Sequence, residues 1–139
     1  MAERRLAITW VNHSYSHPYE PNVPLEGNFL LAPGVDFQRE VLATETLFLE
    51  NGLVPSPFFR FPGLVAGEKV LAELRELSLI PIGSDAWLAK GEVPRKGSFI
   101  LIHGNGNEPQ GIRKVFPLLR DPKGEQFLPL RTAFSGVVH

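Results

Sequence analysis

The sequence contains no cysteine, and this absence excludes several kinds of site at once. Disulfide bonds, zinc sites with thiolate ligands and a cysteine nucleophile all need a residue type that the chain does not have. The cellular compartment stays open, because many secreted proteins also lack cysteine.

The chain also lacks a large charge of either sign and a long apolar run. Its formal net charge is −1, so the sequence shows neither the excess of basic residues typical of nucleic-acid binding nor a polybasic segment that would bind a membrane surface. The apolar stretch after the first arginines is too short for a signal peptide or a membrane span. With 139 residues, 43% of them hydrophobic, we expect one soluble globular domain, residues 1–139.

Apolar periodicity predicts that strands and helices alternate along the chain. Residues 18–35 are rich in proline and glycine and predict a long loop. Alternation of this kind favours an α/β protein with a mostly parallel sheet. The strands are expected at residues 6–11, 57–62, 78–83 and 97–103, and the helices between Asp36 and Gly52, at 67–77 and at 112–119.

The residues with useful chemistry follow the predicted strands. His13 comes after the first strand and Arg60 at the end of the second. Asp85 and Trp87 come after the third, and His103 ends the fourth. Functional sites in parallel α/β proteins are built at the carboxyl ends of strands, so we expect these residues to belong to a site.

The stretch "HSYSHP" places His13 and His17 four residues apart. A helical turn would put both imidazoles on one face, where they could bind one divalent ion such as Zn²⁺, Ni²⁺ or Co²⁺. The alternative is a pair of loop histidines that only form local hydrogen bonds. The spacing alone leaves both interpretations open.

The later candidates also have two interpretations each. His103 can be a general acid or base, or a strand-end histidine bonded to backbone. Asp85 and Trp87 can orient His103 and line a pocket, or they can be a turn aspartate and a core tryptophan. Arg60 lies in the apolar context "FFRFPG", which predicts a buried carboxylate partner, either structural or functional.

Taken in order, these segments resemble the polysaccharide deacetylase family, the NodB-homology domain of carbohydrate esterases. The stretch "HSYSHP" is similar to the family's histidine motif, in which a serine or threonine follows the first histidine and a proline follows the second. The stretch "RFPG" resembles its Arg-x-Pro-x-Gly motif but is one residue shorter, "GSDAW" resembles its Asp and Trp motif, and "LIH" its Leu-x-His motif. The resemblance covers residues 6 to about 120.

The resemblance implies a distorted, incomplete (β/α) barrel with a mostly parallel sheet and a divalent metal, usually zinc. It implies hydrolysis of an acetyl group from an N- or O-acetylated poly- or oligosaccharide. It gives His13 and His17 the role of metal ligands and His103 the role of general acid. It makes Asp85 the residue that tunes His103, and it makes Arg60 the residue that orients the catalytic base. Sugar contacts are assigned to Trp87, Tyr15 and Pro62.

The sequence departs from the family pattern at its N-terminal end. The family has an Asp-Asp pair before the histidines, which supplies the base and a third metal ligand, whereas no aspartate precedes His13 here. We therefore expect a truncated form, in which Glu3, Glu20 or Glu108 would have to replace the base. The alternatives are a non-catalytic carbohydrate- or metal-binding remnant, and an α/β scaffold completed by a partner chain or a second copy at an exposed sheet edge.

Overall fold

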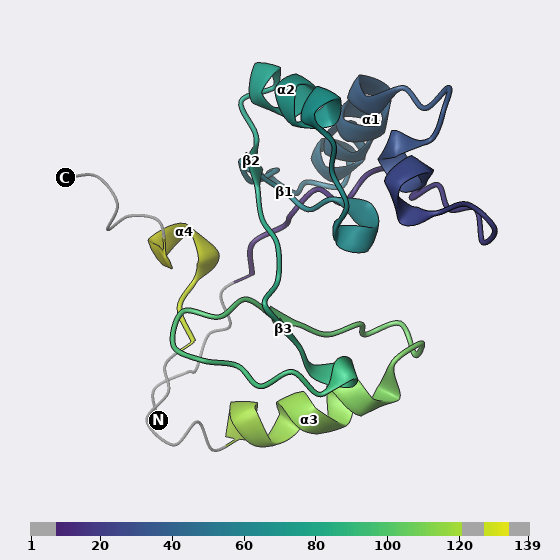
Figure 1. Cartoon of the computed structure of the whole chain (residues 1–139). Coiled ribbons are helices and arrows are strands. Elements are labelled where there is room, and N and C mark those ends of the chain that lie inside the picture. The colour runs from purple at the N-terminus through teal and green to yellow at the C-terminus, as the bar shows by residue number, and fades with distance from the viewer. Residues whose placement is uncertain (1–7, 121–126, 134–139) are drawn as a thin grey trace. The chain divides into compact units, whose positions relative to one another are not determined.

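The computed structural model describes residues 8–120 and 127–133 (Figure 1). The chain divides into two compact units, Met1–Ile82 and Gly83–His139, which we call unit 1 and unit 2. Whether they act as the single domain expected from the length stays a prediction.

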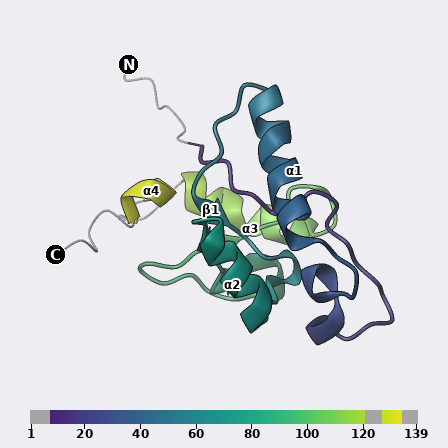
Figure 2. The same cartoon turned by 90° about the horizontal axis from the view of Figure 1, so that it is seen from above.

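Two helices of unit 1 confirm the periodicity of the sequence. Helix α1 spans Phe37–Glu50 and begins at Asp36, whose side chain accepts a hydrogen bond of 3.0 Å from the backbone N–H of Arg39. Helix α2 spans Glu68–Glu76 and follows Gly67. The two helices contact each other, and Figure 2 shows them from above.

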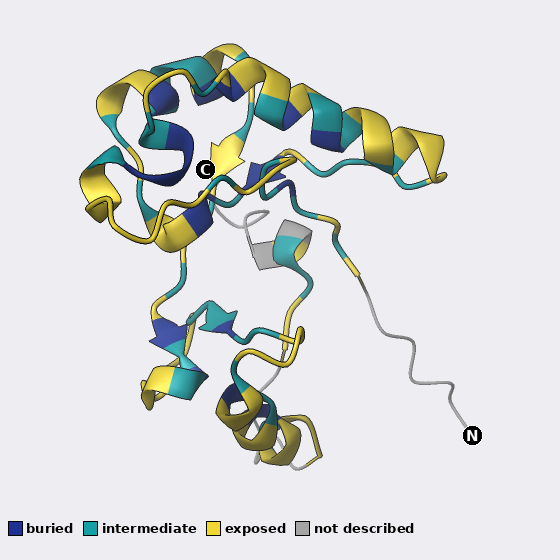
Figure 3. Cartoon of the chain, turned by 90° about the vertical axis from the view of Figure 1, so that its right-hand side faces the viewer, coloured by how far each residue is buried: buried dark blue, intermediate teal, exposed yellow. Residues whose placement is uncertain are grey.

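The core of unit 1 is a cluster of aromatic and aliphatic side chains between these helices and the neighbouring strand. Phe37 of α1 packs against Phe59 and Phe61, with ring centroids 5.7 and 6.1 Å away. Figure 3 shows the buried residues along one side of α1, while the opposite side is exposed. The buried members of the cluster are Leu30, Phe37, Val41, Phe59, Phe61, Val70 and Leu74.

Strands β1, Phe58–Phe59, and β2, Ile80–Pro81, form a short parallel pair. Pro81 is tolerated because the flanking residues supply the donors: Ile80 donates to the Pro57 carbonyl at 2.7 Å and Ile82 to the Phe59 carbonyl at 2.8 Å. The first predicted strand is wrong over residues 8–11, which are not a strand. Instead, Asn12 forms one isolated parallel bridge with Phe59.

The long loop of unit 1 contains short 3₁₀ turns rather than irregular chain alone. Turn η1 spans Leu25–Gly27 and turn η2 spans Phe29–Leu31. A third turn, η3, spans Pro62–Leu64 and follows β1 closely. Phe29 and Leu30 of η2 are buried, so this loop closes one side of the unit 1 core.

Unit 2 is a second, smaller α/β arrangement. Strands β3, Ala86–Trp87, and β4, Ile100–Leu101, pair in parallel. Turn η4, Leu88–Lys90, follows β3 and packs against α3, Pro109–Arg120, whose buried Gly111 lies next to Ala89. A last helical turn, α4, spans Leu130–Ala133.

The described residues therefore form a mixed α/β protein with two small parallel two-stranded sheets. This confirms the predicted class and the parallel pairing. The described residues form no barrel, because each sheet stops at two strands of two residues each. Over the described ranges, no helix has the length and apolar character needed to cross a membrane.

Candidate functional site

The turn that carries the histidine pair is built on Asn12, which is fully buried in unit 1. Its backbone accepts from Arg60 N–H at 2.8 Å, which ties the turn to the end of β1. Its side-chain amide donates to the Val41 carbonyl of α1 at 2.9 Å, and its side-chain oxygen accepts from Ser14 N–H at 3.1 Å. Asn12 therefore links the strand, the helix and the start of the turn.

His13 is oriented by backbone. Its Nδ1 lies 2.8 Å from the carbonyl oxygen of Arg60. A carbonyl oxygen only accepts, so Nδ1 carries the hydrogen, and in the neutral ring Nε2 then holds the lone pair. Histidine metal ligands commonly donate their other ring N–H to a backbone carbonyl in this way.

His17 is held by two aromatic rings. Its ring stands edge-on to His13, with centroids 5.1 Å apart, and to Phe29, with centroids 5.5 Å apart. Phe29 also stacks on Tyr19, with centroids 5.2 Å apart, and faces Gly63, where a Cβ atom would lie 2.3 Å from the Phe29 ring. Glycine at position 63 thus allows Phe29 to support His17, which gives the "RFPG" stretch a packing role at the histidine pair.

The backbone between the histidines is not a helical turn, contrary to the expectation from spacing. Ser14 and His17 have φ values of 69° and 48°, in the left-handed region. Each such conformation costs about 1–2 kcal/mol for a residue other than glycine, so other contacts must hold it. Glu40 of α1 supplies them: its carboxylate accepts from Tyr15 N–H at 3.1 Å, and from Ser16 N–H at 2.8 Å and its hydroxyl at 2.7 Å.

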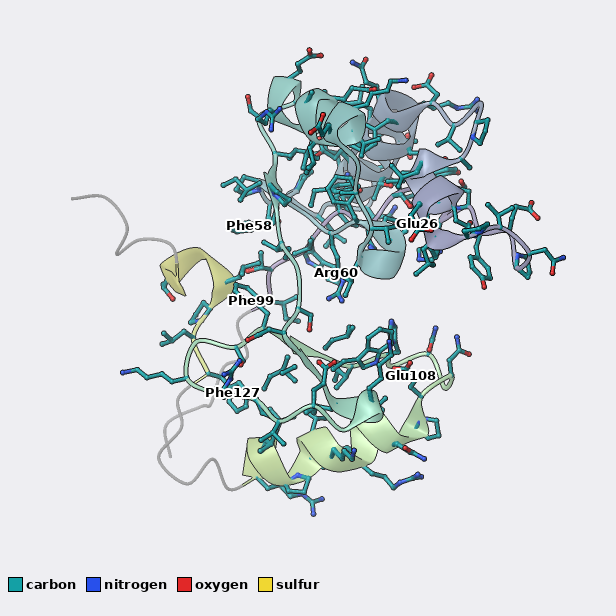
Figure 4. All side chains as sticks on the ribbon, in the orientation of Figure 1. Glu26, Phe58, Arg60, Phe99, Glu108 and Phe127 are labelled. Carbon is teal, nitrogen blue, oxygen red and sulfur yellow. The ribbon has the colours of Figure 1, made fainter. Side chains whose placement is uncertain are left out.

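Three other predicted residues of unit 1 have mixed outcomes. Arg60, labelled in Figure 4, is half-buried, and burial lowers the pKa of its guanidinium. Within the described part of the chain, no carboxylate forms an ion pair with Arg60, so the predicted partner is not found there. Tyr15 is exposed, which suits ligand contact, whereas Pro62 is fully buried, which does not.

The candidate metal ligands that lie together in unit 1 are His13 and His17, whose ring centroids are 5.1 Å apart. In residues 8–120 and 127–133, no three His, Asp or Glu side chains come together in a way that would hold a metal ion. The candidate carboxylate Glu3 lies outside the described residues. The structure thus brings the rings of His13 and His17 together, and the described residues contain no group of three His, Asp or Glu side chains around them that would hold a metal ion.

Unit 2 contains a separate cluster around His103. The Nδ1 atom of His103 lies 2.7 Å from Oε2 of Glu108, a carboxylate at the start of α3 (Figure 4). The indole N–H of Trp87 donates to the same oxygen at 2.8 Å. The hydrogen bond from His103, followed by that from Trp87, lowers the pKa of the Glu108 carboxyl group.

The Trp87 ring is a contact surface within this cluster. Its centroid lies 5.5 Å from that of His103, and the Lys90 ammonium lies 3.6 Å from the indole ring. The backbone N–H of Trp87 donates to the Glu92 carboxylate at 2.6 Å. Trp87 is therefore partly buried, and its ring and backbone are held by contacts with His103, Lys90 and Glu92.

Asp85 does not occupy the place that the sequence predicted. Its carboxylate accepts from Phe99 N–H at 2.7 Å and from the Ser98 hydroxyl at 3.0 Å. The Phe99 bond is the main cause that lowers the pKa of Asp85. Asp85 thus links the residue before β3 to the residues before β4. The carboxylate that contacts His103 is Glu108.

Sequence reasoning missed the residues that position the histidines. Asn12 and Glu40 had no assigned role, and Glu108 was named only as a candidate replacement base. Glu108 had a usable signal, because it directly precedes Pro109, a residue type that favours the first position of a helix. Glu40 had none, because it lies 24 and 25 residues along the chain from its partners.

Comparison with known proteins does not identify a family or a fold relative for the chain. The chain matches no protein-family model. No solved structure matches it either.

Proposed function

We propose that this chain is a polysaccharide-deacetylase-like domain in which His13 and His17 bind a divalent metal ion, with zinc as the first candidate. The observation that carries the proposal is the orientation of His13, whose Nδ1–H donates to the Arg60 carbonyl at 2.8 Å while its ring lies 5.1 Å from that of His17. The substrate class is an N- or O-acetylated poly- or oligosaccharide, taken from the resemblance.

The ring separation supports binding of one ion by both histidines. Two imidazoles on one tetrahedral zinc ion, each bound at about 2.0–2.1 Å, have ring centroids roughly 5 Å apart. The separation of His13 and His17 is 5.1 Å. The ring separation is therefore compatible with one ion shared by the two histidines.

The resemblance supplies the remaining roles in the proposal. A bound divalent ion supplies Lewis-acid polarisation of an acetyl carbonyl and lowers the pKa of bound water. His103 is proposed to donate a proton to the leaving group, and Trp87 and Tyr15 to contact sugar. The family's barrel would need strands beyond those that the described residues form.

A second candidate is a metal- or carbohydrate-binding domain without catalysis. It needs neither a third metal ligand nor a catalytic base, and the described residues contain no group of three His, Asp or Glu side chains that would hold a metal ion. It also agrees with the missing carboxylate partner of Arg60 among those residues, since in the family this arginine orients the base. A scaffold completed by a partner chain or a second copy is the third alternative.

Isothermal titration calorimetry with Zn²⁺, Co²⁺ and Ni²⁺ tests the metal site. We expect one ion per chain for the wild type and no saturable heat for the His13→Ala, His17→Ala double variant. The matched control is His103→Gln, which removes a histidine in unit 2 and is expected to keep the wild-type affinity. Equal binding by the double variant and the wild type would refute the metal site.

Acetate release then separates the first candidate from the second. The wild-type chain is incubated with an acetylated chito-oligosaccharide and an excess of zinc, and free acetate is measured enzymatically. Metal-dependent release that is lost in the double histidine variant supports the deacetylase. Metal binding without acetate release supports the non-catalytic domain.

A further inference from the structure

We propose that His103, Glu108 and Trp87 form a proton-transfer site in unit 2, in which Nε2 of His103 exchanges the proton and Glu108 is its positioning residue. The reaction that uses this proton rests on the proposed function. The arrangement itself rests on contacts within unit 2. Neither Glu108 nor its bond to Trp87 belongs to the pattern that pointed to His103 from the sequence.

One oxygen atom holds the cluster together. Oε2 of Glu108 accepts from Nδ1 of His103 at 2.7 Å and from Nε1 of Trp87 at 2.8 Å. The backbone of Glu108 is fixed too, because its carbonyl accepts from Gly111 N–H at 3.0 Å in the first turn of α3. The carboxylate is therefore set by the helix at one end and by the indole at the other.

This arrangement selects the reactive nitrogen of His103. An ionised carboxylate accepts only, so Nδ1 keeps its hydrogen and Nε2 carries the lone pair of the neutral ring. When Nε2 takes a proton, the ring becomes an imidazolium facing Glu108; when Nε2 gives that proton to a leaving oxygen or nitrogen, the neutral ring returns. Glu108 stays ionised throughout, so the proton count of the pair changes only at Nε2.

Trp87 and its neighbours limit the movement of Glu108. The indole is the second donor to Oε2, and it is itself held by β3 and by a backbone bond to Glu92 of 2.6 Å. The charged groups around the pair are the Lys90 ammonium over the indole and the Glu92 carboxylate at the Trp87 backbone. The negative charge of Glu108 thus lies beside the indole N–H of Trp87, on a side chain that is 25% exposed.

The tautomer of His103 is the direct test. In protein labelled with ¹⁵N-histidine, the signals of His103 are assigned with His103→Gln, and the two ring nitrogens are distinguished by long-range proton–nitrogen spectra above the titration range. We expect the Nδ1–H form in the wild type. Glu108→Gln keeps this form through its amide oxygen, whereas Glu108→Ala shifts the ring toward Nε2–H, the form that neutral histidine favours in water.

Two control variants make this test specific. Glu92→Gln alters the other carboxylate at Trp87, and Asp85→Asn alters the residue that the sequence had assigned to His103. Both are expected to leave the Nδ1–H form in place. An unchanged tautomer in Glu108→Ala, with a folded unit shown by its amide spectrum, would overturn the proposal, as would loss of the Nδ1–H form in Asp85→Asn.

Kinetics separate this proposal from the proposed function. If the zinc-loaded chain releases acetate, Glu108→Gln is expected to lower kcat by about 10²-fold with KM nearly unchanged, and to alter the pH profile of kcat. Equal kcat in Glu108→Gln and the wild type would refute the positioning role. If the wild type releases no acetate, the proposed deacetylase activity fails, and the tautomer still decides whether Glu108 orients His103.

Discussion

The histidines of the two units are oriented by opposite kinds of partner. In unit 1, His13 donates to the neutral backbone carbonyl of Arg60, and the nearby carboxylate, Glu40, accepts from backbone N–H groups. In unit 2, His103 donates directly to the carboxylate of Glu108. The two carboxylates thus differ in role: Glu40 binds the backbone of a turn, and Glu108 binds an imidazole.

This difference separates two uses of histidine. A carbonyl partner fixes the tautomer without adding a negative charge, and metal binding needs the neutral ring. A carboxylate partner also fixes the tautomer and stabilises the imidazolium when it forms, as proton transfer requires. The His13 and His17 pair therefore suits an ion, and His103 suits a proton.

Among the variants that test this comparison, Gly63→Ala in unit 1 is expected to have the largest effect on the free energy of unfolding. The new methyl group meets the Phe29 ring, 2.3 Å from the ideal Cβ position, at a φ of 62°. Strain and overpacking together are expected to reduce the free energy of unfolding by about 3 kcal/mol. Urea unfolding measures this loss, and calorimetry is expected to show weaker zinc binding as His17 loses its support.

Gly34→Ala is the matched control for this change. Gly34 also has a positive φ, 81°, but nothing lies within 4 Å of its Cβ position. It therefore carries the backbone strain alone, and we expect a loss of about 1 kcal/mol with unchanged zinc affinity. Equal losses in the two variants would show that contact with Phe29 contributes nothing.

A smaller effect is expected from Glu40→Gln, which tests whether a carboxylate on backbone prepares the histidine pair. An amide oxygen is a weaker acceptor than a carboxylate and can replace only part of the three bonds to Tyr15 and Ser16. We expect zinc affinity to fall about 10-fold, the range seen when groups that orient metal ligands are changed. Titration calorimetry measures the affinity.

The control for Glu40→Gln is Glu45→Gln, on the same helix. The side chain of Glu45 forms no hydrogen bond or ion pair within the described part of the chain, and its substitution is expected to leave zinc affinity unchanged. If both variants bind zinc as the wild type does, the left-handed turn does not depend on Glu40.

The smallest effect is expected on the pH dependence of Tm, through two carboxylates of unit 2. Hydrogen bonds lower the pKa values of Asp85 and Glu108 in the folded protein. Such carboxylates stabilise the fold above their unfolded pKa values of about 4, and this contribution is lost as the pH falls through the lowered folded values. The difference in Tm between the wild type and an Asp85→Asn, Glu108→Gln variant should therefore be largest above pH 5 and shrink toward pH 3. A constant difference would contradict it.

The sequence predicted the elements that depend on local signals. Helix α1 has a capping residue at Asp36, and Phe37, Val41 and Thr44, which share one helical face, all become buried. The strands were predicted too long, because apolar runs show where a strand can be buried and not how many of its residues find a partner. Only Phe58 and Phe59 of residues 57–62 become a strand.

The candidate site was predictable in its residues and less so in its contacts. The spacing of His13 and His17 brought the two rings together, but through left-handed residues and not through a helical turn. Partners such as Glu40 and Arg60 come from distant segments, and no local pattern marks such contacts. The partner of His103 was assigned to the wrong carboxylate, because Asp85 also had nearer donors in Ser98 and Phe99.

The bond between the Trp87 indole and Glu108 also gives unit 2 an optical signal. The chain has two tryptophans, and the other, Trp10, lies in unit 1, where its ring packs against Phe48. An imidazolium quenches indole emission at short range, so the fluorescence of Trp87 follows the protonation of its neighbour His103. In a Trp10→Phe chain, the remaining emission reports the protonation of His103 without any added label.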